Sequence, residues 1–136
     1  MKLLLDTHIW LRYQGISGDL RAAALPVLNR AAAAAAVYVS VISVWEIALL
    51  VRLGRLSLNT SVDRWTTEAL SKPGIHLLPF TPEIAIDAVN LPDPMHKDPA
   101  DRILVASARA EQLTLVTRDR DILAFAKTIR LQCLQA

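Results

Sequence analysis

The sequence predicts an α/β fold in which a short central parallel sheet is flanked by helices on both faces. The first hydrophobic run, Leu3–Leu5, is continuous rather than alternating, which is typical of a strand covered on both faces. Val37–Ser40 and Thr114–Thr117 are further short segments rich in β-branched residues. Helical patterns separate these strands, and such alternation is typical of parallel sheets with right-handed crossovers.

The first half of the chain divides at clear turn signals. Residues 15–19 are rich in turn formers, and Gly54 marks the end of a helix that Ser40 or Ser43 caps. The alanine run 31–36 favours helix without specifying any packing, so we interpret it as a frayed helix end and connector. The elements expected here are a helix over 8–13, a helix over 20–36, a strand over 37–40 and a helix from about 41 to 53.

The second half follows the same rhythm. Pro73-Gly74 separates a helix from a strand, while Pro82 and Pro99 suit the first position of a helix. Leu91-Pro92-Asp93-Pro94 ends the helix that Pro82 opens. The elements expected here are a helix over 59–72, a strand over 75–80, helices over 82–90 and 99–112, a strand over 114–117, a helix from about 119 to 126 and a strand over 129–134.

Composition limits the class of protein. With 136 residues, the segment 1–136 is expected to form a single domain that buries a real core. It lacks the roughly 20 unbroken apolar residues of a membrane span, and its start is too short and too quickly acidic for a signal peptide. The single Cys133 cannot form an internal disulfide, so we expect a cytoplasmic protein. The net charge is +2, and 11 of the 15 basic residues are arginines, which suit phosphate groups.

Two acids stand near the ends of the first two strands. Asp6 directly follows the first strand, at the edge where open α/β sheets bind ligands. It could instead only cap the turn into the next helix. Glu46 lies in a helix that is apolar almost all round, so its charge needs compensation. A capping box with Ser43 would provide it, and so would a cation shared with Asp6.

Four more acids lie at the starts of later helices. Asp98 is explained as a helix cap before Pro99. Asp101 lies one turn further on and is expected to be held near the same edge of the sheet as Asp6. The helix dipole alone would also favour an acid at Asp101. Asp119 follows the strand that ends at Thr117, and Asp121 comes two residues later. Spacing does not decide which of these two faces the site.

Acids gathered at one sheet edge repel one another unless a divalent cation is present. Oxygen ligands alone select Mg²⁺ or Mn²⁺, and one or two such ions would support hydrolysis of a phosphodiester. A zinc site is not expected, because the histidines and the cysteine show no ligand spacing. An enzyme with an aspartyl nucleophile would need a second acid two residues after Asp6, where His8 stands.

Four motifs in order resemble a known family and span nearly the whole chain. They are Leu3-Leu4-Leu5-Asp6-Thr7-His8, Val39-Ser40-Val41-Ile42-Ser43-Val44-Trp45-Glu46-Ile47-Ala48, His96-Lys97-Asp98-Pro99-Ala100-Asp101-Arg102 and Leu115-Val116-Thr117-Arg118-Asp119. With these motifs the chain resembles PIN-domain ribonucleases of the VapC type, the toxins of type II toxin–antitoxin pairs in bacteria or archaea.

The resemblance implies a PIN-like three-layer fold and a Mg²⁺- or Mn²⁺-dependent endoribonuclease. The acids that it assigns to catalysis and metal binding are Asp6, Glu46, Asp101 and Asp119. The residues that it gives a supporting place are Thr7, Asp98, Thr117 and Asp121. The partners that it implies are an RNA substrate, a small cognate antitoxin whose tail enters the cleft, and a second copy in a homodimer.

Two hypotheses concern the surface, and one alternative concerns the activity. Arg102, Arg118 and Arg120 lie near the expected site and are candidates for contacts with RNA phosphates. The apolar helix 41–53, with Trp10, Trp45 and Trp65, is expected to supply both core and a partner surface. The alternative function is a non-catalytic PIN-like module that binds RNA or protein.

Overall fold

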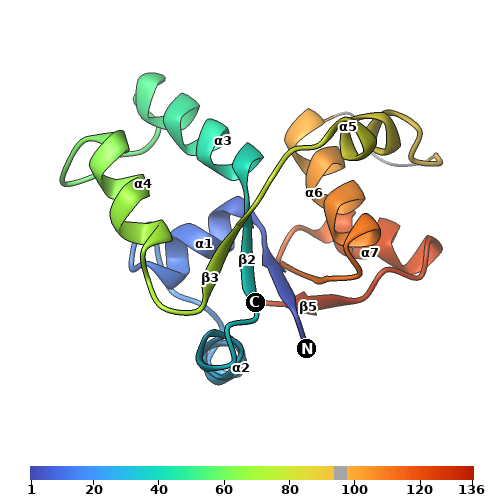
Figure 1. The fold of residues 1–136 in the computed structure, drawn as a ribbon, viewed down its shortest axis with the longest axis horizontal. Coiled ribbons are helices and arrows are strands. Elements are labelled where there is room, and N and C mark those ends of the chain that lie inside the picture. The colour runs from blue at the N-terminus through green and yellow to red at the C-terminus, as the bar shows by residue number, and fades with distance from the viewer. Residues whose placement is uncertain (94–97) are drawn as a thin grey trace.

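The computed structural model, which describes residues 1–93 and 98–136, has a five-stranded parallel sheet between two layers of helices (Figure 1). The strands are β1 (Leu3–Leu5), β2 (Val37–Ser40), β3 (Ile75–Leu78), β4 (Thr114–Thr117) and β5 (Cys133–Gln135). The helices are α1 (Thr7–Tyr13), α2 (Ala24–Ala33), α3 (Val41–Arg52), α4 (Val62–Leu70), α5 (Pro82–Val89), α6 (Pro99–Ala110) and α7 (Arg120–Thr128). All four pairs of neighbouring strands are parallel, so the predicted α/β three-layer class is confirmed.

The order of strands, β3-β2-β1-β4-β5, puts β1 in the middle of the sheet. The chain first builds outward from β1 to β2 and β3, and later adds β4 and β5 on the other side. Such a change of direction opens a crevice at the carboxyl ends of the two strands that flank it, here β1 and β4. In Figure 1 this is the upper edge, where β2 runs directly into α3.

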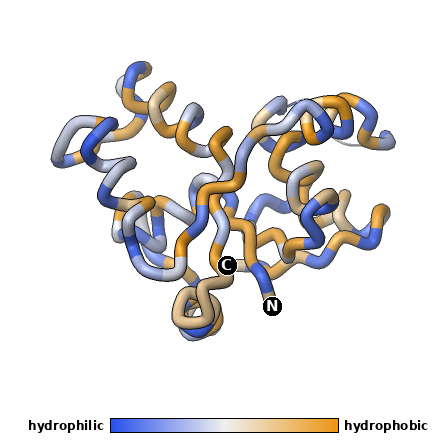
Figure 2. Tube along the Cα trace, in the orientation of Figure 1, coloured by the Kyte–Doolittle hydropathy of each residue, from blue (hydrophilic) through white to orange (hydrophobic). Residues whose placement is uncertain are grey.

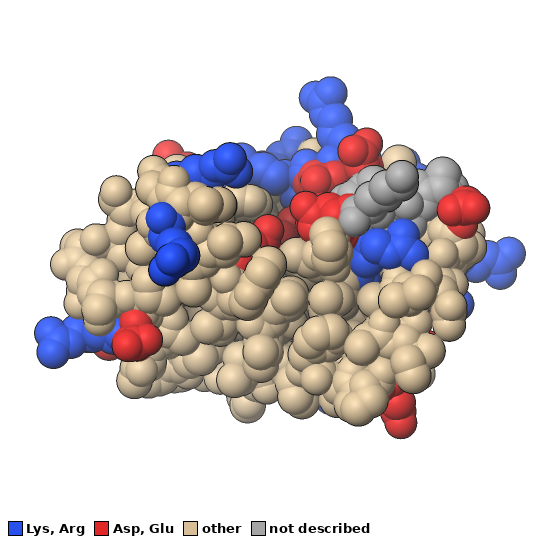
Figure 3. Space-filling view, turned by 90° about the horizontal axis from the view of Figure 1, so that it is seen from above, with Lys and Arg blue, Asp and Glu red and all other residues tan. Residues whose placement is uncertain are grey.

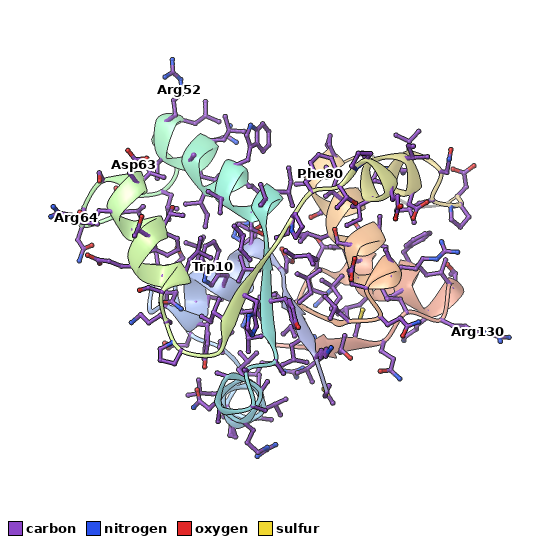
Figure 4. The ribbon with its side chains drawn as sticks, in the orientation of Figure 1. Trp10, Arg52, Asp63, Arg64, Phe80 and Arg130 are labelled. Carbon is purple, nitrogen blue, oxygen red and sulfur yellow. The ribbon has the colours of Figure 1, made fainter. Side chains whose placement is uncertain are left out.

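The core has two parts, one on each face of the sheet. Leu3 and Leu5 pack in a hydrophobic cluster with α1, α2 and α4, while Leu4 packs in another with α6 and α7. Figure 2 shows the apolar residues that follow the central strands. Trp10 and Trp65 belong to the first cluster, with ring centroids 5.0 Å apart, and Figure 4 shows Trp10 pointing inward. The continuous hydrophobic run of the first strand therefore predicted correctly that both faces are covered.

Several boundaries differ from the sequence prediction for local reasons. Helix α2 ends before Ala35, whose φ of 54° lies outside the helical region, and α4 begins only after Ser61, whose hydroxyl accepts from the Arg64 N–H. The last strand is shorter than expected because α7 continues to Thr128 and Arg130 has a φ of 58°. No helix in the described part of the chain has both the length and the hydrophobicity of a membrane span. Pro94, His96 and Lys97 lie outside the described residues.

Candidate metal centre

All four acids of the predicted metal site line one cavity of about 410 Å³ at the carboxyl edge of the sheet. The residues around it are Asp6, His8, Arg12, Glu46, Asp98, Asp101, Arg118 and Asp119. Figure 3 looks down on this edge and shows acidic side chains gathered in a hollow, with basic side chains around it. The acids come from separate parts of the chain, so it is the fold that brings them together.

Asp6 and Asp119 are linked through one hydroxyl group. Thr117 Oγ1 donates to Asp6 Oδ2 at 2.7 Å and accepts from the Asp119 N–H at 3.1 Å. The register of β1 against β4 fixes this arrangement, because the Asp6 N–H donates to Val116 O at 2.9 Å. Asp6 stands at the N-cap position of α1, but its side chain makes no capping hydrogen bond. Capping alone therefore does not explain its buried carboxylate.

Glu46 reaches the cavity from the second turn of α3. The cap of this helix is Ser40, whose Oγ accepts from the Ile42 N–H at 3.1 Å, so the capping box of Ser43 with Glu46 is wrong. The Ser43 hydroxyl instead bonds the Thr7 hydroxyl at 2.8 Å, in the buried space between α1 and α3. Because Ser43 and Glu46 are three residues apart, they lie on the same face of the helix.

The starts of α6 and α7 bring the remaining acids. Asp98 Oδ1 caps α6 by accepting from the Asp101 N–H at 3.1 Å, and both residues line the cavity. Asp119 Oδ1 caps α7 by accepting from the N–H groups of Asp121 and Ile122 at 2.8 and 3.0 Å. Asp121 is exposed and is not among the lining residues. Of the two candidates after β4, it is therefore Asp119 that faces the cavity.

The acids disfavour one another's charge. Burial, followed by the charges of Asp98, Asp6, Asp119 and Glu46, raises the pKa of Asp101 to about 8. Burial is also the main cause that raises the pKa of Asp6 and of Glu46, while the nearby His8 acts in the opposite direction on both. Like charges held together in this way are tolerated when a cation lies among them.

The chemistry of the donors fits a hard divalent ion. Carboxylate oxygens dominate the lining, and such ligands select Mg²⁺ or Mn²⁺ over zinc. Within residues 1–93 and 98–136, no three His, Cys, Asp or Glu side chains converge as a ready-made ligand set. This is compatible with Mg²⁺, because that ion usually keeps several waters and takes only one or two carboxylates.

The sequence prediction missed two lining residues and proposed two arginines that do not line the cavity. His8 and Arg12 are one helical turn apart on α1, so they share a face with each other, and this spacing after Asp6 was the available signal. Arg102 Nε and Nη2 donate to Ala88 O and Val89 O at the end of α5. Neither Arg102 nor Arg120 is among the lining residues, whereas Arg118 is.

Comparison with known proteins agrees with this geometry. The profile of the PIN domain matches residues 3–128. The chain belongs to the PIN domain family. Ribonuclease VapC22 from Mycobacterium tuberculosis is 32% identical to this PIN domain over 118 residues, which is 87% of each chain. The family predicted from the four motifs is confirmed.

Solved structures share the fold of this PIN domain. FitAcB from Neisseria gonorrhoeae matches with a TM-score of 0.67 and 23% identity, over 97% of this chain and 96% of that one. VapBC2 from Rickettsia felis, bound to a DNA fragment from its promoter, matches with a TM-score of 0.70 and 17% identity over 100% and 99%. A toxin–antitoxin complex from Klebsiella pneumoniae matches with a TM-score of 0.60 and 22% identity over 88% and 89%. The three likenesses show that these structures share one fold with at least 88% of this chain.

The raised pKa of Asp101 predicts how stability depends on pH in metal-free protein. The folded state keeps a proton on Asp101 up to about pH 8, whereas the unfolded chain releases it near pH 4, so stability falls as pH rises through this window. We expect Asp101→Asn to raise the free energy of unfolding at pH 8 by about 1 kcal/mol, allowing for partial solvent exposure, and to change it little at pH 4. Thermal melts in EDTA at the two pH values measure this, with Asp63→Asn on the outer face of α4 as control (Figure 4). A variant that melts no higher than wild type at pH 8 would contradict the assigned pKa.

Proposed function

We propose that this chain is a metal-dependent endoribonuclease that acts as the toxin of a type II toxin–antitoxin pair. The observation that carries the proposal is that Asp6, Glu46, Asp101 and Asp119 line one cavity in a PIN domain. The 32% identity to a ribonuclease supports RNA as the substrate. In this proposal, residues 1–136 form a single PIN domain.

The four acids would hold Mg²⁺ or Mn²⁺, with Asp98 beside them. When bound, the ion would activate a water molecule and stabilise negative charge at the scissile phosphate. Thr117 keeps the carboxylate of Asp6 and the backbone of Asp119 in a fixed relation. The Thr7–Ser43 hydrogen bond ties the start of α1 to the helix that carries Glu46. These hydroxyls therefore serve to position the acids.

The activity is tested with purified protein and a pool of structured RNAs, in Mg²⁺, in Mn²⁺ and in EDTA. We expect cleavage with either ion and none in EDTA. Calorimetric titration of both ions accompanies the assay. Protein that binds the ions and the RNA but cleaves no member of the pool would favour the alternative, a non-catalytic PIN-like module. Protein that binds neither ion would contradict the metal site.

The proposed protein partners are a small antitoxin and a second copy of the chain. The similar structures named VapBC2 and the Klebsiella toxin–antitoxin complex support an antitoxin. The hypothesis of a partner surface on α3 gains support from Trp45, which is 57% exposed, whereas Trp10 and Trp65 are buried in the core. On α5, Ile86 and Val89 are also exposed. Sedimentation that shows only monomer at micromolar concentration would contradict a homodimer through this surface.

A cytoplasmic location belongs to the same proposal. Cys133 is a free thiol, and burial raises its pKa to about 11, so little of the reactive thiolate forms near neutral pH. RNA and an antitoxin would both be present in the cytoplasm. Fractionation of cells that express a tagged chain tests this location, and recovery of the chain outside the cytoplasmic fraction would contradict it.

A further inference from the structure

Two arginines lie side by side on one wall of the acidic cavity. Arg12 Nη1 and Arg118 Nη2 both donate to Asp19 O, at 3.3 and 3.1 Å. Arg118 Nη2 also donates to Ala136 O at 2.6 Å. Both arginines line the cavity that the acids share. One backbone oxygen of the turn after α1 therefore gathers two positive charges beside the candidate metal centre.

The hydrogen bonding of both guanidinium groups is incomplete. Arg12 Nε and Arg118 Nε are buried and have no acceptor among the described residues. A guanidinium has five N–H donors in a planar fork, and the acceptor that both groups share, Asp19 O, is a backbone carbonyl oxygen without a full charge. A buried donor without an acceptor is unfavourable, so this wall lacks the partner that its donors require.

The carboxylates of the cavity do not supply that partner. The main charges that act on the pKa of Asp6, Glu46 and Asp101 are those of His8 and of the other acids. The arginine pair and the acid cluster thus remain two separate regions of opposite charge in one cavity. Gly18 leaves room for the Arg12 guanidinium, since a Cβ there would approach Arg12 Nη1 to 3.2 Å.

We propose that Arg12 and Arg118 jointly bind one backbone phosphate of the RNA, next to the phosphate that is cleaved at the acids. This inference rests on the proposed function. A phosphate offers several strong acceptor oxygens and a negative charge, which match two forked guanidinium groups. RNA also carries phosphates at every nucleotide, so one strand can place one phosphate at the acids and a neighbouring one at the arginines.

The test is binding of a fluorescein-labelled 12-nucleotide single-stranded RNA, measured by anisotropy in EDTA at 25 to 200 mM salt. We expect Arg12→Gln and Arg118→Gln each to weaken binding about 3- to 10-fold and to lower the salt slope by about 0.7, the value for one phosphate contact on a single strand. The double variant should lower the slope no further, because both side chains bind the same phosphate. The matched control is Arg64→Gln, since Figure 4 shows Arg64 pointing outward from α4.

Several outcomes would overturn the proposal. If both single variants bind RNA with the wild-type affinity and salt slope, neither arginine contacts a phosphate. A slope that falls twice as far in the double variant would show two separate phosphates rather than one. If Arg12→Gln fails to fold, Arg12→Lys replaces it, because lysine keeps the charge but loses the forked donors. We expect Arg12→Lys to bind RNA with an affinity between those of wild type and Arg118→Gln. If Arg12→Lys and Arg118→Gln both bind RNA as tightly as wild type, the proposed arginine pair is contradicted.

Cleavage assays separate this inference from the proposed function. With an active wild type, the single variants should raise KM several-fold and leave kcat within about a factor of two, because they remove binding that is equal in ground and transition state. Unchanged KM in an active enzyme would overturn only the arginine site. A wild type that cleaves no RNA would overturn the proposed function, while the anisotropy measurement still decides whether the arginines bind phosphate.

Discussion

Replacing Asp6 or Asp101 by asparagine is expected to reduce RNA cleavage in Mg²⁺ by at least about 100-fold, because each change removes a charged ligand from the site where a metal would stabilise the transition state. Asparagine keeps the shape and one oxygen, so Asp6→Asn can still accept from Thr117. Asp101→Asn removes an acid whose pKa is raised by burial, so the variant should fold at least as well as wild type. The measurement is single-turnover cleavage of the best substrate from the RNA pool.

The same assay has two matched controls. Asp63→Asn lies on α4, outside the cavity, and should cleave like wild type. The second control compares Asp119→Asn with Asp121→Asn, because Asp119 lines the cavity and Asp121 does not. Asparagine is also a good helix cap, so Asp119→Asn should keep α7 and lose activity. Full activity in Asp6→Asn and Asp101→Asn would rule out the acidic centre, and a larger loss in Asp121→Asn would reverse the choice between the two neighbours.

Replacing Gly74 by alanine is expected to cost at least about 3 kcal/mol of stability, from a left-handed backbone and an overlap with the backbone of α2. Gly74 has a φ of 82°, and a Cβ there would overlap the carbonyl oxygen of Ala32 at the end of α2. The backbone would have to move, yet Gly74 O also accepts from the Val37 N–H at the start of β2. Thermal melting should show a drop of roughly 10 °C.

Gly15 provides the control for this substitution. Its φ is 79°, nearly the same as that of Gly74, but a Cβ there would have no atom within 4 Å. Gly15→Ala should therefore lose only the stability that the backbone conformation costs, about 1 kcal/mol of unfolding free energy or 3 to 4 °C in melting temperature. Equal losses for the two variants would mean that the packing of Gly74 against α2 contributes nothing.

The sheet and the edge where the acids gather were predictable because they depend on local signals. Continuous hydrophobicity at Leu3–Leu5 required cover on both faces, and Pro82 and Pro99 marked helix starts. Asp6 directly follows β1 and Asp119 lies two residues after β4, so parallel strands had to bring them to one edge. Glu46 was noticeable because an isolated charge in an apolar helix needs a partner.

The parts that were not predictable depend on contacts between distant segments. The pairing of Thr7 with Ser43 spans 36 residues, and it replaces the capping box that spacing alone allowed. Arg12 and Arg118 meet only because both reach the carbonyl of Asp19, which no periodic pattern encodes. Arg102 lies beside the predicted acids in sequence, but its guanidinium turns to the end of α5.

The most direct test of the metal centre is titration of Mn²⁺ into metal-free protein at pH 7.5, with free Mn²⁺ measured by electron paramagnetic resonance. We expect saturable binding to wild type and to Asp63→Asn, and affinity at least about 10-fold weaker in Asp6→Asn and Asp101→Asn, since each loses a carboxylate ligand. Equal affinity in all four proteins would contradict the claim that these acids form a divalent metal site.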